Sequence, residues 1–218
     1  MKKLYFVLFA SAIAANLFAQ KEASNDPDAK KILDAVSEKF QSYKTVQASF
    51  TYKVENGDGK AISTKKGTVF MKGMKYRVSF VGQEIYCDGA TVWSYDKSSN
   101  EVTITKLDVS SNTITPQKLF TDFYDKDFLY KLNGESKVDG KTVEEIEMTP
   151  NDKNKTFHKV YLMIDKSAKT IYSTKVLEKT GDRYSYTVNS LKANANIPDA
   201  KFIFDKKEYP GVEEVDLR

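Results

Sequence analysis

The stretch VQASFTYKV at residues 46–54 alternates apolar and polar side chains without a break. Because successive side chains of a β-strand point to opposite faces, we expect Phe50 and Tyr52 on one face and Lys53 on the other. The same period of two recurs through residues 46–191, with clusters of Gly, Asn and Asp between the segments. Short consecutive strands joined by tight turns predict an antiparallel meander.

We expect about ten or eleven strands from this pattern. They cover residues 46–54, 67–71, 75–80, 83–87, 91–95, 101–107, 128–132, 142–148, 157–164, 171–178 and 184–191. Turn signals at Asn133-Gly134 and Asp139-Gly140 separate two of them. A last segment, residues 201–204, is expected to pair at an edge of the sheet. No repeat or linker divides the chain, so residues 20–218 are predicted to form one domain.

Two helices are predicted among the strands. Asp26-Pro27 and Thr115-Pro116 each join a capping side chain to a proline suited to the first helical turn. Each start is followed by apolar residues at helical spacing, the second run ending before Asp125. Because each helix is apolar on one side, both must cover another element, and we interpret them as a lid. The lid candidates are Ile32, Leu33, Val36, Phe40, Leu119, Phe120 and Phe123.

Residues 1–19 have the pattern of a cleaved signal peptide. Lys2 and Lys3 precede an apolar run, and the small residue Ala19 offers a cleavage point. The run is short for a membrane span, although an uncleaved anchor is the alternative. The expected product is an exported, soluble protein, which is periplasmic in a host with two membranes.

The composition argues against several classes of function. Loss of Lys2 and Lys3 lowers the formal net charge from +4 to +2, with no concentrated basic face for nucleic acid. One His (His158) and one Cys (Cys87) give little for nucleophilic or metal chemistry, and neither a metal nor an organic cofactor is implied. Glu145 and Glu147 fall on one strand face, which is typical of a wet surface. A transmembrane barrel is a further alternative, but the two apolar-striped helices have no place in it.

The apolar face of the predicted sheet cannot remain in water. Each large side chain left wet forgoes roughly 1.5–3 kcal/mol, and two helices fill the inside of a curled sheet poorly. On these residues alone, a hydrophobic cavity and an ordinary packed core are equally open, and core packing stays the alternative for every candidate. The cavity candidates are Phe50, Tyr52, Tyr76, Val78, Phe80, Ile85, Trp93, Tyr95, Val102, Ile104, Tyr161 and Met163.

Four motifs resemble one known family in the same order. They are ASFT within residues 46–54, CDGATVWSYD at residues 87–96, Thr115-Pro116, and DAKFIF at residues 199–204 followed by PGV at residues 210–212. Together they resemble the outer-membrane lipoprotein carrier proteins, the LolA family. The resemblance implies a mainly β fold, an incomplete, unclosed antiparallel barrel covered by two or three short helices. It also implies no enzymatic activity.

The resemblance further implies a function and partners. A protein of this family carries the acyl chains of lipoproteins through the periplasm, from an inner-membrane ABC-type release complex toward an outer-membrane acceptor. We expect a monomer. The family's corner Arg that latches the lid is absent here, where residues 72–74 read KGM. Counting back from Tyr76 aligns Lys72 with that Arg, which makes it a candidate latch, whereas counting forward from Gly67 aligns Gly73. A lipid-sensing or glycolipid-binding protein of the same fold is the alternative, because the presence of a cavity does not identify the ligand that it binds.

Overall fold

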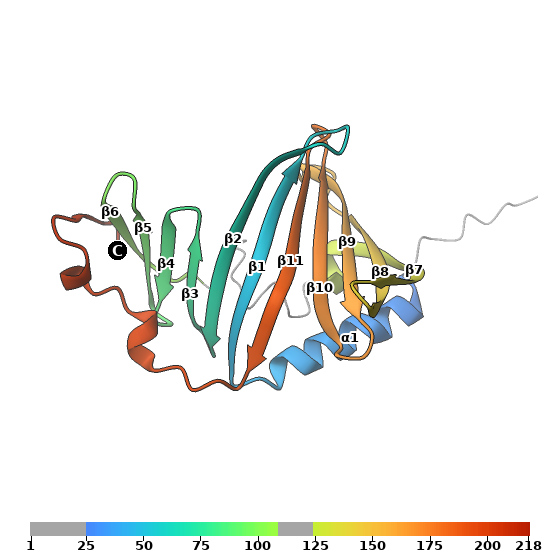
Figure 1. The fold of residues 1–218 in the computed structure, drawn as a ribbon, viewed down its shortest axis with the longest axis horizontal. Coiled ribbons are helices and arrows are strands. Elements are labelled where there is room, and N and C mark those ends of the chain that lie inside the picture. The colour runs from blue at the N-terminus through green and yellow to red at the C-terminus, as the bar shows by residue number, and fades with distance from the viewer. Residues whose placement is uncertain (1–24, 109–123) are drawn as a thin grey trace, which may run out of the picture.

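The computed structural model describes residues 25–108 and 124–218. Within these residues the chain forms one open sheet of twelve strands, in the order β12-β6-β5-β4-β3-β2-β1-β11-β10-β9-β8-β7. All neighbouring strands are antiparallel except β12, which runs parallel to β6. The two end strands, β12 and β7, do not pair, so the expected unclosed, barrel-like fold is confirmed. Figure 1 shows the sheet with α1 beside β7–β10 and the C-terminal segment beside β3–β6.

The first half of the sheet is a simple meander. Its strands are β1 (Thr45–Glu55), β2 (Ala61–Lys72), β3 (Lys75–Phe80), β4 (Gln83–Cys87), β5 (Thr91–Asp96) and β6 (Glu101–Lys106). The second half comprises β7 (Phe128–Val138), β8 (Lys141–Pro150), β9 (Phe157–Asp165), β10 (Thr170–Glu178) and β11 (Arg183–Ala193). Strand β11 returns to pair with β1 and joins the two halves.

The described helical elements are short. The first, α1 (Pro27–Gln41), begins at the predicted cap, where Asp26 accepts a hydrogen bond from the Asp28 amide. Helix α2 (Tyr124–Asp127) is a single turn directly before β7. The expected helix start at Thr115-Pro116 lies outside the described residues. Two short 3₁₀ helices, η2 (Asp199–Phe202) and η3 (Lys206–Glu208), precede β12 (Glu213–Asp216).

Two local predictions are corrected. Asn133-Gly134 was expected to end a strand, but β7 continues through it with a bulge, and Gly134 adopts a φ of 128°. A bulge needs the same permissive backbone as a turn, so the sequence signal is shared. Residues 201–204 do not pair at an edge. Phe202 and Phe204 are buried, and Glu213–Asp216 makes the edge strand β12 instead.

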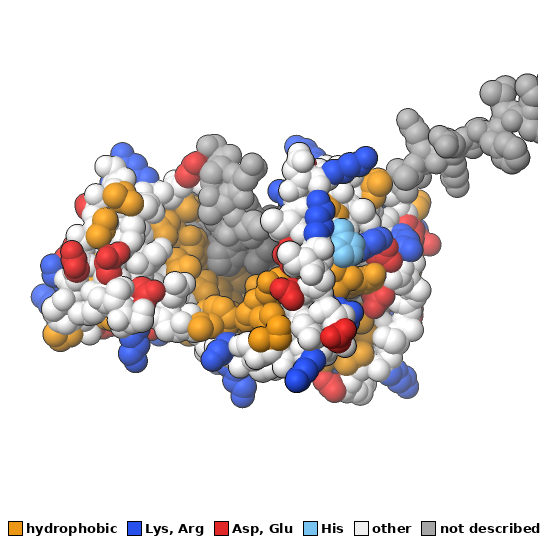
Figure 2. All heavy atoms as spheres, turned by 90° about the horizontal axis from the view of Figure 1, so that it is seen from above, with side chains coloured by type: hydrophobic (Ala, Val, Ile, Leu, Met, Phe, Trp, Pro, Cys, Tyr) orange, Lys and Arg blue, Asp and Glu red, His pale blue; other side chains and the backbone are white. Residues whose placement is uncertain are grey.

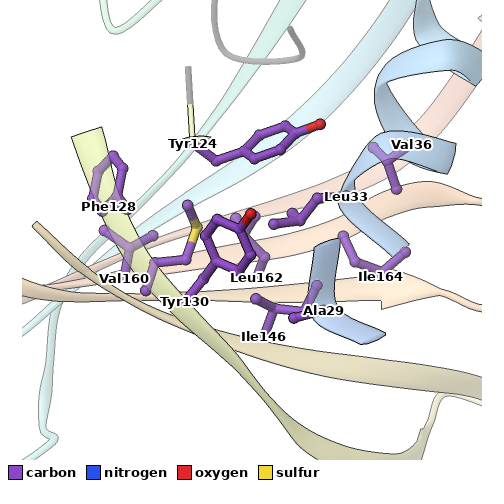
Figure 3. Packing of buried hydrophobic residues seen from close by; sticks show 11 residues of the cluster. Ala29, Leu33, Val36, Tyr124, Phe128, Tyr130, Ile146, Val160, Leu162 and Ile164 are labelled. Carbon is purple, nitrogen blue, oxygen red and sulfur yellow. The ribbon is translucent and has the colours of Figure 1, made fainter. Parts of the chain in front are cut away.

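The core lies in separate clusters on the two faces of the sheet. We call the face that packs against α1 the inner face. Beneath α1, its Ala29, Leu33 and Val36 point toward side chains of β7, β8 and β9 (Figure 3). Those partners are Tyr130, Ile146, Met148, Val160, Leu162 and Ile164. On the outer face of β4–β6, the C-terminal segment packs a second cluster around Phe204 and Val212.

Candidate functional site: an aromatic wall on the inner face

Strand register determines which side chains share the inner face. Phe50 pairs with Gly67 and Gly67 with Phe80, so a single row crosses β1, β2 and β3. On the other side, Phe50 pairs with Val188 and Tyr52 with Tyr186 of β11. Cross-strand partners point to the same face. These residues therefore lie on the inner face, at the end of the long strands that α1 leaves uncovered.

The region of the inner face that α1 leaves uncovered is a contiguous wall of rings. We call Phe50, Tyr52, Phe80, Tyr184 and Tyr186 the aromatic wall. Tyr52 lies at its centre, with ring centroids 4.9 Å from Tyr186, 5.3 Å from Phe80 and 6.0 Å from Tyr184. Tyr186 is 43 % exposed, although large hydrophobic rings are more often buried. Figure 2 shows hydrophobic side chains lining the hollow between the two flanks of the sheet.

Gly67 supports this wall from below. A Cβ at this position would lie 2.3 Å from Phe50 Cζ, closer than atoms can approach. The Phe50 ring therefore rests directly on the glycine backbone, and it holds its place against Phe80 at a centroid distance of 5.7 Å. Glycine in a strand interior often marks such a close approach.

The phenols of Tyr52 and Tyr186 are neutral at neutral pH. Burial, followed by the neighbouring Tyr186 and Tyr184, raises the pKa of Tyr52 above its usual range. Burial likewise raises the pKa of Tyr186. The wall thus presents uncharged, broad surfaces that suit an apolar ligand.

Half of the predicted cavity residues lie on this inner face. Phe50, Tyr52 and Phe80 belong to the aromatic wall. Tyr76, Val78 and Ile85 follow on β3 and β4, packed around Val46, Ala48, Met71 and Cys87. The structure therefore brings together six of the twelve predicted residues.

The other six lie on the outer face, which corrects the face predicted for them. Trp93, Tyr95 and Val102 alternate with the inner-face residues and pack beneath Phe204 and Tyr209. Ile104 pairs with Trp93 and shares that face. The physical reason is that the C-terminal segment covers the outer face of β4–β6 with a second apolar layer. The aromatic side chains of β5 therefore point outward and pack against this layer.

Tyr161 and Met163 lie on the outer face for a different reason. On β9 the residues that pack beneath α1 are Val160, Leu162 and Ile164. Because strand side chains alternate, Tyr161 and Met163 point to the outer face, opposite Glu147 and Glu145 of β8. Residues 160–164 of β9 are apolar in both phases, and within them the larger side chains, Tyr161 and Met163, are on the side away from the helix.

Helix α1 covers the β7–β10 half of the inner face. Leu33 and Val36 are 3 % and 6 % exposed, and Ile32 and Phe40 pack at the margins of two clusters. These four lid candidates are thus packed against the sheet. Leu119, Phe120 and Phe123 lie outside the described residues.

Polar contacts fasten the start of α1 to the edge strand β7. The Leu132 amide donates to Asp26 Oδ2 at 3.0 Å, and the Asp26 amide donates to the Tyr130 carbonyl at 3.1 Å. The hydrogen bond from the Leu132 amide, followed by that from Asp28, holds the pKa of Asp26 below its usual range. These bonds also cover part of an edge that would otherwise be open to pairing.

A network of side chains adds to this attachment. Lys30 Nζ donates to Asp34 at 3.0 Å and to Asp125 at 2.9 Å, while the Tyr130 hydroxyl donates to Asp125 at 2.6 Å. The Tyr130 and Lys30 bonds lower the pKa of Asp125. Burial and the Asp125 carboxylate raise the pKa of Tyr130 to about 12. Helix α1 is therefore held at its start by charge-assisted bonds as well as by packing.

The candidate latch Lys72 contacts the C-terminal segment. Its Nζ lies 2.7 Å from Asp199 Oδ1 and donates to the Ile197 carbonyl at 3.4 Å, while Lys75 reaches the other Asp199 oxygen at 2.9 Å. Lys72, followed by Lys75, lowers the pKa of Asp199 to about 2. These contacts join the corner after β2 to η2, and none of them reaches α1.

Sequence reasoning missed Tyr184, Tyr186 and Gly67. The strand containing both tyrosines was predicted, but its face was not assigned. The usable signal was that Tyr184, Tyr186 and Val188 alternate with polar residues, as Phe50 and Tyr52 do on β1. Gly67 gives no such signal, because its role depends on the ring that lies over it.

The described residues contain little that suits catalysis. Cys87 is fully buried, and burial raises the pKa of its thiol, which disfavours the reactive thiolate. Glu147 pairs with Lys159 and Lys131 on the outer face. Within residues 25–108 and 124–218, no group of three or more His, Cys, Asp or Glu is placed to hold a metal ion. None of the helices in these ranges is both long and apolar enough to span a membrane.

Comparison with known proteins identifies relatives over most of the chain. Residues 41–205 match the family model described as outer membrane lipoprotein carrier protein LolA. An outer-membrane lipoprotein carrier protein of Pseudomonas putida (strain GB-1) is 26 % identical over 203 residues, covering 91 % of this chain and 93 % of the relative. Its counterpart from Cupriavidus pinatubonensis is 28 % identical over 184 residues, covering 79 % and 84 %.

Two solved structures share the fold. An uncharacterized conserved protein from Thermus thermophilus superposes with a TM-score of 0.60 at 15 % identity, covering 87 % of this chain and 99 % of its own. MucB superposes with a TM-score of 0.51 at 17 % identity, covering 83 % of this chain and 64 % of its own. At these identities the likeness concerns the fold alone.

Proposed function

Because the chain belongs to the outer membrane lipoprotein carrier protein LolA family, we propose that it is a periplasmic carrier for lipoprotein acyl chains. It takes them from an inner-membrane ABC-type release complex and passes them toward the outer membrane. The observation that carries this proposal is the aromatic wall, a row of rings on the inner face that α1 leaves uncovered.

The wall matches what a carrier of acyl chains requires. Each methylene buried gains roughly 0.8 kcal/mol, so a long chain gains on the order of 10 kcal/mol and cannot be left in water. Flat rings at centroid distances of 4.9–6.3 Å give a chain broad contact without a fitted slot. We propose that the acyl chains contact Phe50, Tyr52, Tyr76, Val78, Phe80 and Ile85, together with Tyr184 and Tyr186.

The test compares matched substitutions on the two faces of the sheet. A fluorescent apolar probe is titrated into the purified protein, into Phe50→Glu and into the outer-face control Met163→Glu. A charge in the wall should abolish saturable binding, whereas the same charge on the outer face of β9 should leave it unchanged. Absence of saturable binding to the unaltered protein, or an equal loss in both variants, would refute the proposed site.

The cargo is tested separately. Mass spectrometry of lipid that co-purifies with the protein from the periplasm of its native host should detect lipoprotein. Phe50→Glu should carry less of it. Recovery of free glycolipid alone would assign the same fold to a glycolipid-binding or lipid-sensing function.

A further inference from the structure

A polar cavity lies beside the aromatic wall, on the same face of the sheet. It has a volume of about 290 Å³ and lies over β4, β5 and β6. Six of its lining residues belong to the inner-face rows, namely Gln83, Ile85, Ser94, Asp96, Glu101 and Thr103. Ser99, between β5 and β6, and Tyr95, whose ring packs on the outer face, complete the lining. Nothing in the carriage of acyl chains requires such a cavity, because its lining offers hydrogen-bonding groups where the neighbouring strands offer rings.

Register shows that the cavity and the wall are continuous. The row Phe50–Gly67–Phe80 goes on to Gln83 of β4, then Asp96 of β5 and Glu101 of β6. The adjacent row runs from Val78 through Ile85 and Ser94 to Thr103. Both rows change from apolar to polar between β3 and β5. Adjacent strands are about 4.8 Å apart, so Asp96 lies about 10 Å from the Phe80 strand.

The cavity is negatively charged. The Ser98 hydroxyl and amide donate to Asp96 Oδ1 at 2.6 and 2.7 Å. These bonds, followed by one from Gln83, lower the pKa of Asp96, so this carboxylate is ionised at neutral pH. Glu101 adds a second carboxylate on the same row. Carboxylates accept hydrogen bonds from hydroxyl, amide and ammonium groups and repel phosphate or another carboxylate.

We propose that this cavity holds the polar head of the cargo, and that it selects a head rich in hydrogen-bond donors and without net negative charge. The inference rests on the proposed function, since the acyl chains of the same molecule would lie on the aromatic wall. The inner face then binds an amphiphile along its own apolar-to-polar gradient. Peptide amides and lysine ammonium groups close to the acylated end of a peptide, or the hydroxyls of a sugar head, fit this chemistry.

The test uses three amphiphiles that carry the same two acyl chains. Two are acylated Cys-Ser peptides ending in Lys-Lys or in Glu-Glu, and the third carries a neutral glucosyl head. The Lys-Lys peptide should bind about fivefold more tightly than the Glu-Glu peptide at low ionic strength, with the difference shrinking in salt. The glucosyl compound should lie between them if charge dominates, and should equal or exceed the Lys-Lys peptide if a sugar head is the natural occupant.

A pair of double variants supplies the control. Asp96→Asn with Glu101→Gln removes both charges while keeping the oxygen that accepts from Ser98, and it should bind the two peptides equally. Asp152→Asn with Glu208→Gln makes the same charge change at exposed positions, where Asp152 also accepts from a turn amide at 2.8 Å, and it should keep the preference.

The outcomes separate the two proposals. If all three amphiphiles bind equally to the unaltered protein, or if the Glu-Glu peptide binds best, the head-group inference is refuted and chain binding stands. If none of them shows saturable binding, the proposed function itself fails.

Discussion

The contact between Phe50 and Gly67 gives a sharp prediction about the wall. In Gly67→Ala, the new Cβ would overlap the Phe50 ring at 2.3–2.9 Å, so the ring must swing off the backbone and lose its contact with Phe80. Overpacking of this kind costs about 1–3 kcal/mol. In a Phe50→Ala background the ring is absent, and replacing a strand glycine by alanine should instead gain roughly 0.5–1 kcal/mol. The same substitution should therefore change sign.

Thermal unfolding of the four proteins measures this coupling. A chain of this size shifts its Tm by about 2–4 °C per kcal/mol, so Gly67→Ala alone should lower the Tm by about 2–12 °C. In Phe50→Ala it should leave the Tm unchanged or raise it slightly. The cycle should yield a coupling free energy of about 1.5–4 kcal/mol. Equal effects of Gly67→Ala in both backgrounds would show that the ring does not rest on the glycine.

Three further perturbations test other parts of the structure. Lys141, followed by turn amides, lowers the pKa of Asp165 to about 2. The Asp165 carboxylate therefore stabilises the fold fully above its usual pKa of 3.8, and this stabilisation is lost as pH falls through about 2. The unfolding free energy of Asp165→Asn should be lower than that of the unaltered protein at neutral pH, and this difference should vanish between about pH 4 and 2 when both are measured at decreasing pH. Tyr86→Phe removes bonds to Glu84 and Tyr209, and urea unfolding should show a loss of about 1–3 kcal/mol with probe binding unchanged, because Tyr86 faces outward. Leu33→Ala should cost about 2–5 kcal/mol in the same assay, and a loss below about 1 kcal/mol would contradict its burial.

Strand positions were predictable because period-two alternation is a local property of the chain. The predicted segments at residues 75–80 and 83–87 coincide with β3 and β4. The face of each strand was less accessible, because it depends on which layer covers it. On β1 only the side chains that alternate in step with Phe50 are apolar, so these could be assigned to the inner face from the sequence. On β5 both Val92 and Trp93 are apolar, so alternation cannot say which points inward.

The decisive layer for β5 comes from far along the chain. Phe204 and Tyr209 stack with ring centroids 4.6 Å apart, and Tyr95 lies 4.4 Å from Tyr209. These residues follow η2, in a segment whose sequence suggested an edge strand. No local pattern indicates that residues more than a hundred positions later will cover the outer face. Six of the twelve predicted cavity residues were consequently placed on the wrong side of the sheet, four of them beneath this segment and two on β9.

The attachment of α1 bears on how the proposed cargo would be accommodated. Moving the helix aside would expose Leu33 and Val36 together with the margins formed by Ile32 and Phe40, at roughly 1.5–3 kcal/mol for each side chain, and would break the bonds to β7. This sum, on the order of 10 kcal/mol, equals the gain from burying one long acyl chain. Under the proposed function, one chain would therefore lie on the aromatic wall with α1 in place, because displacing the helix would cost about as much as the chain gains. Under the proposed function, two or three chains on one molecule would supply enough transfer free energy to displace the helix. The number of chains, rather than the chemistry of each, would then decide whether the β7–β10 half of the inner face opens.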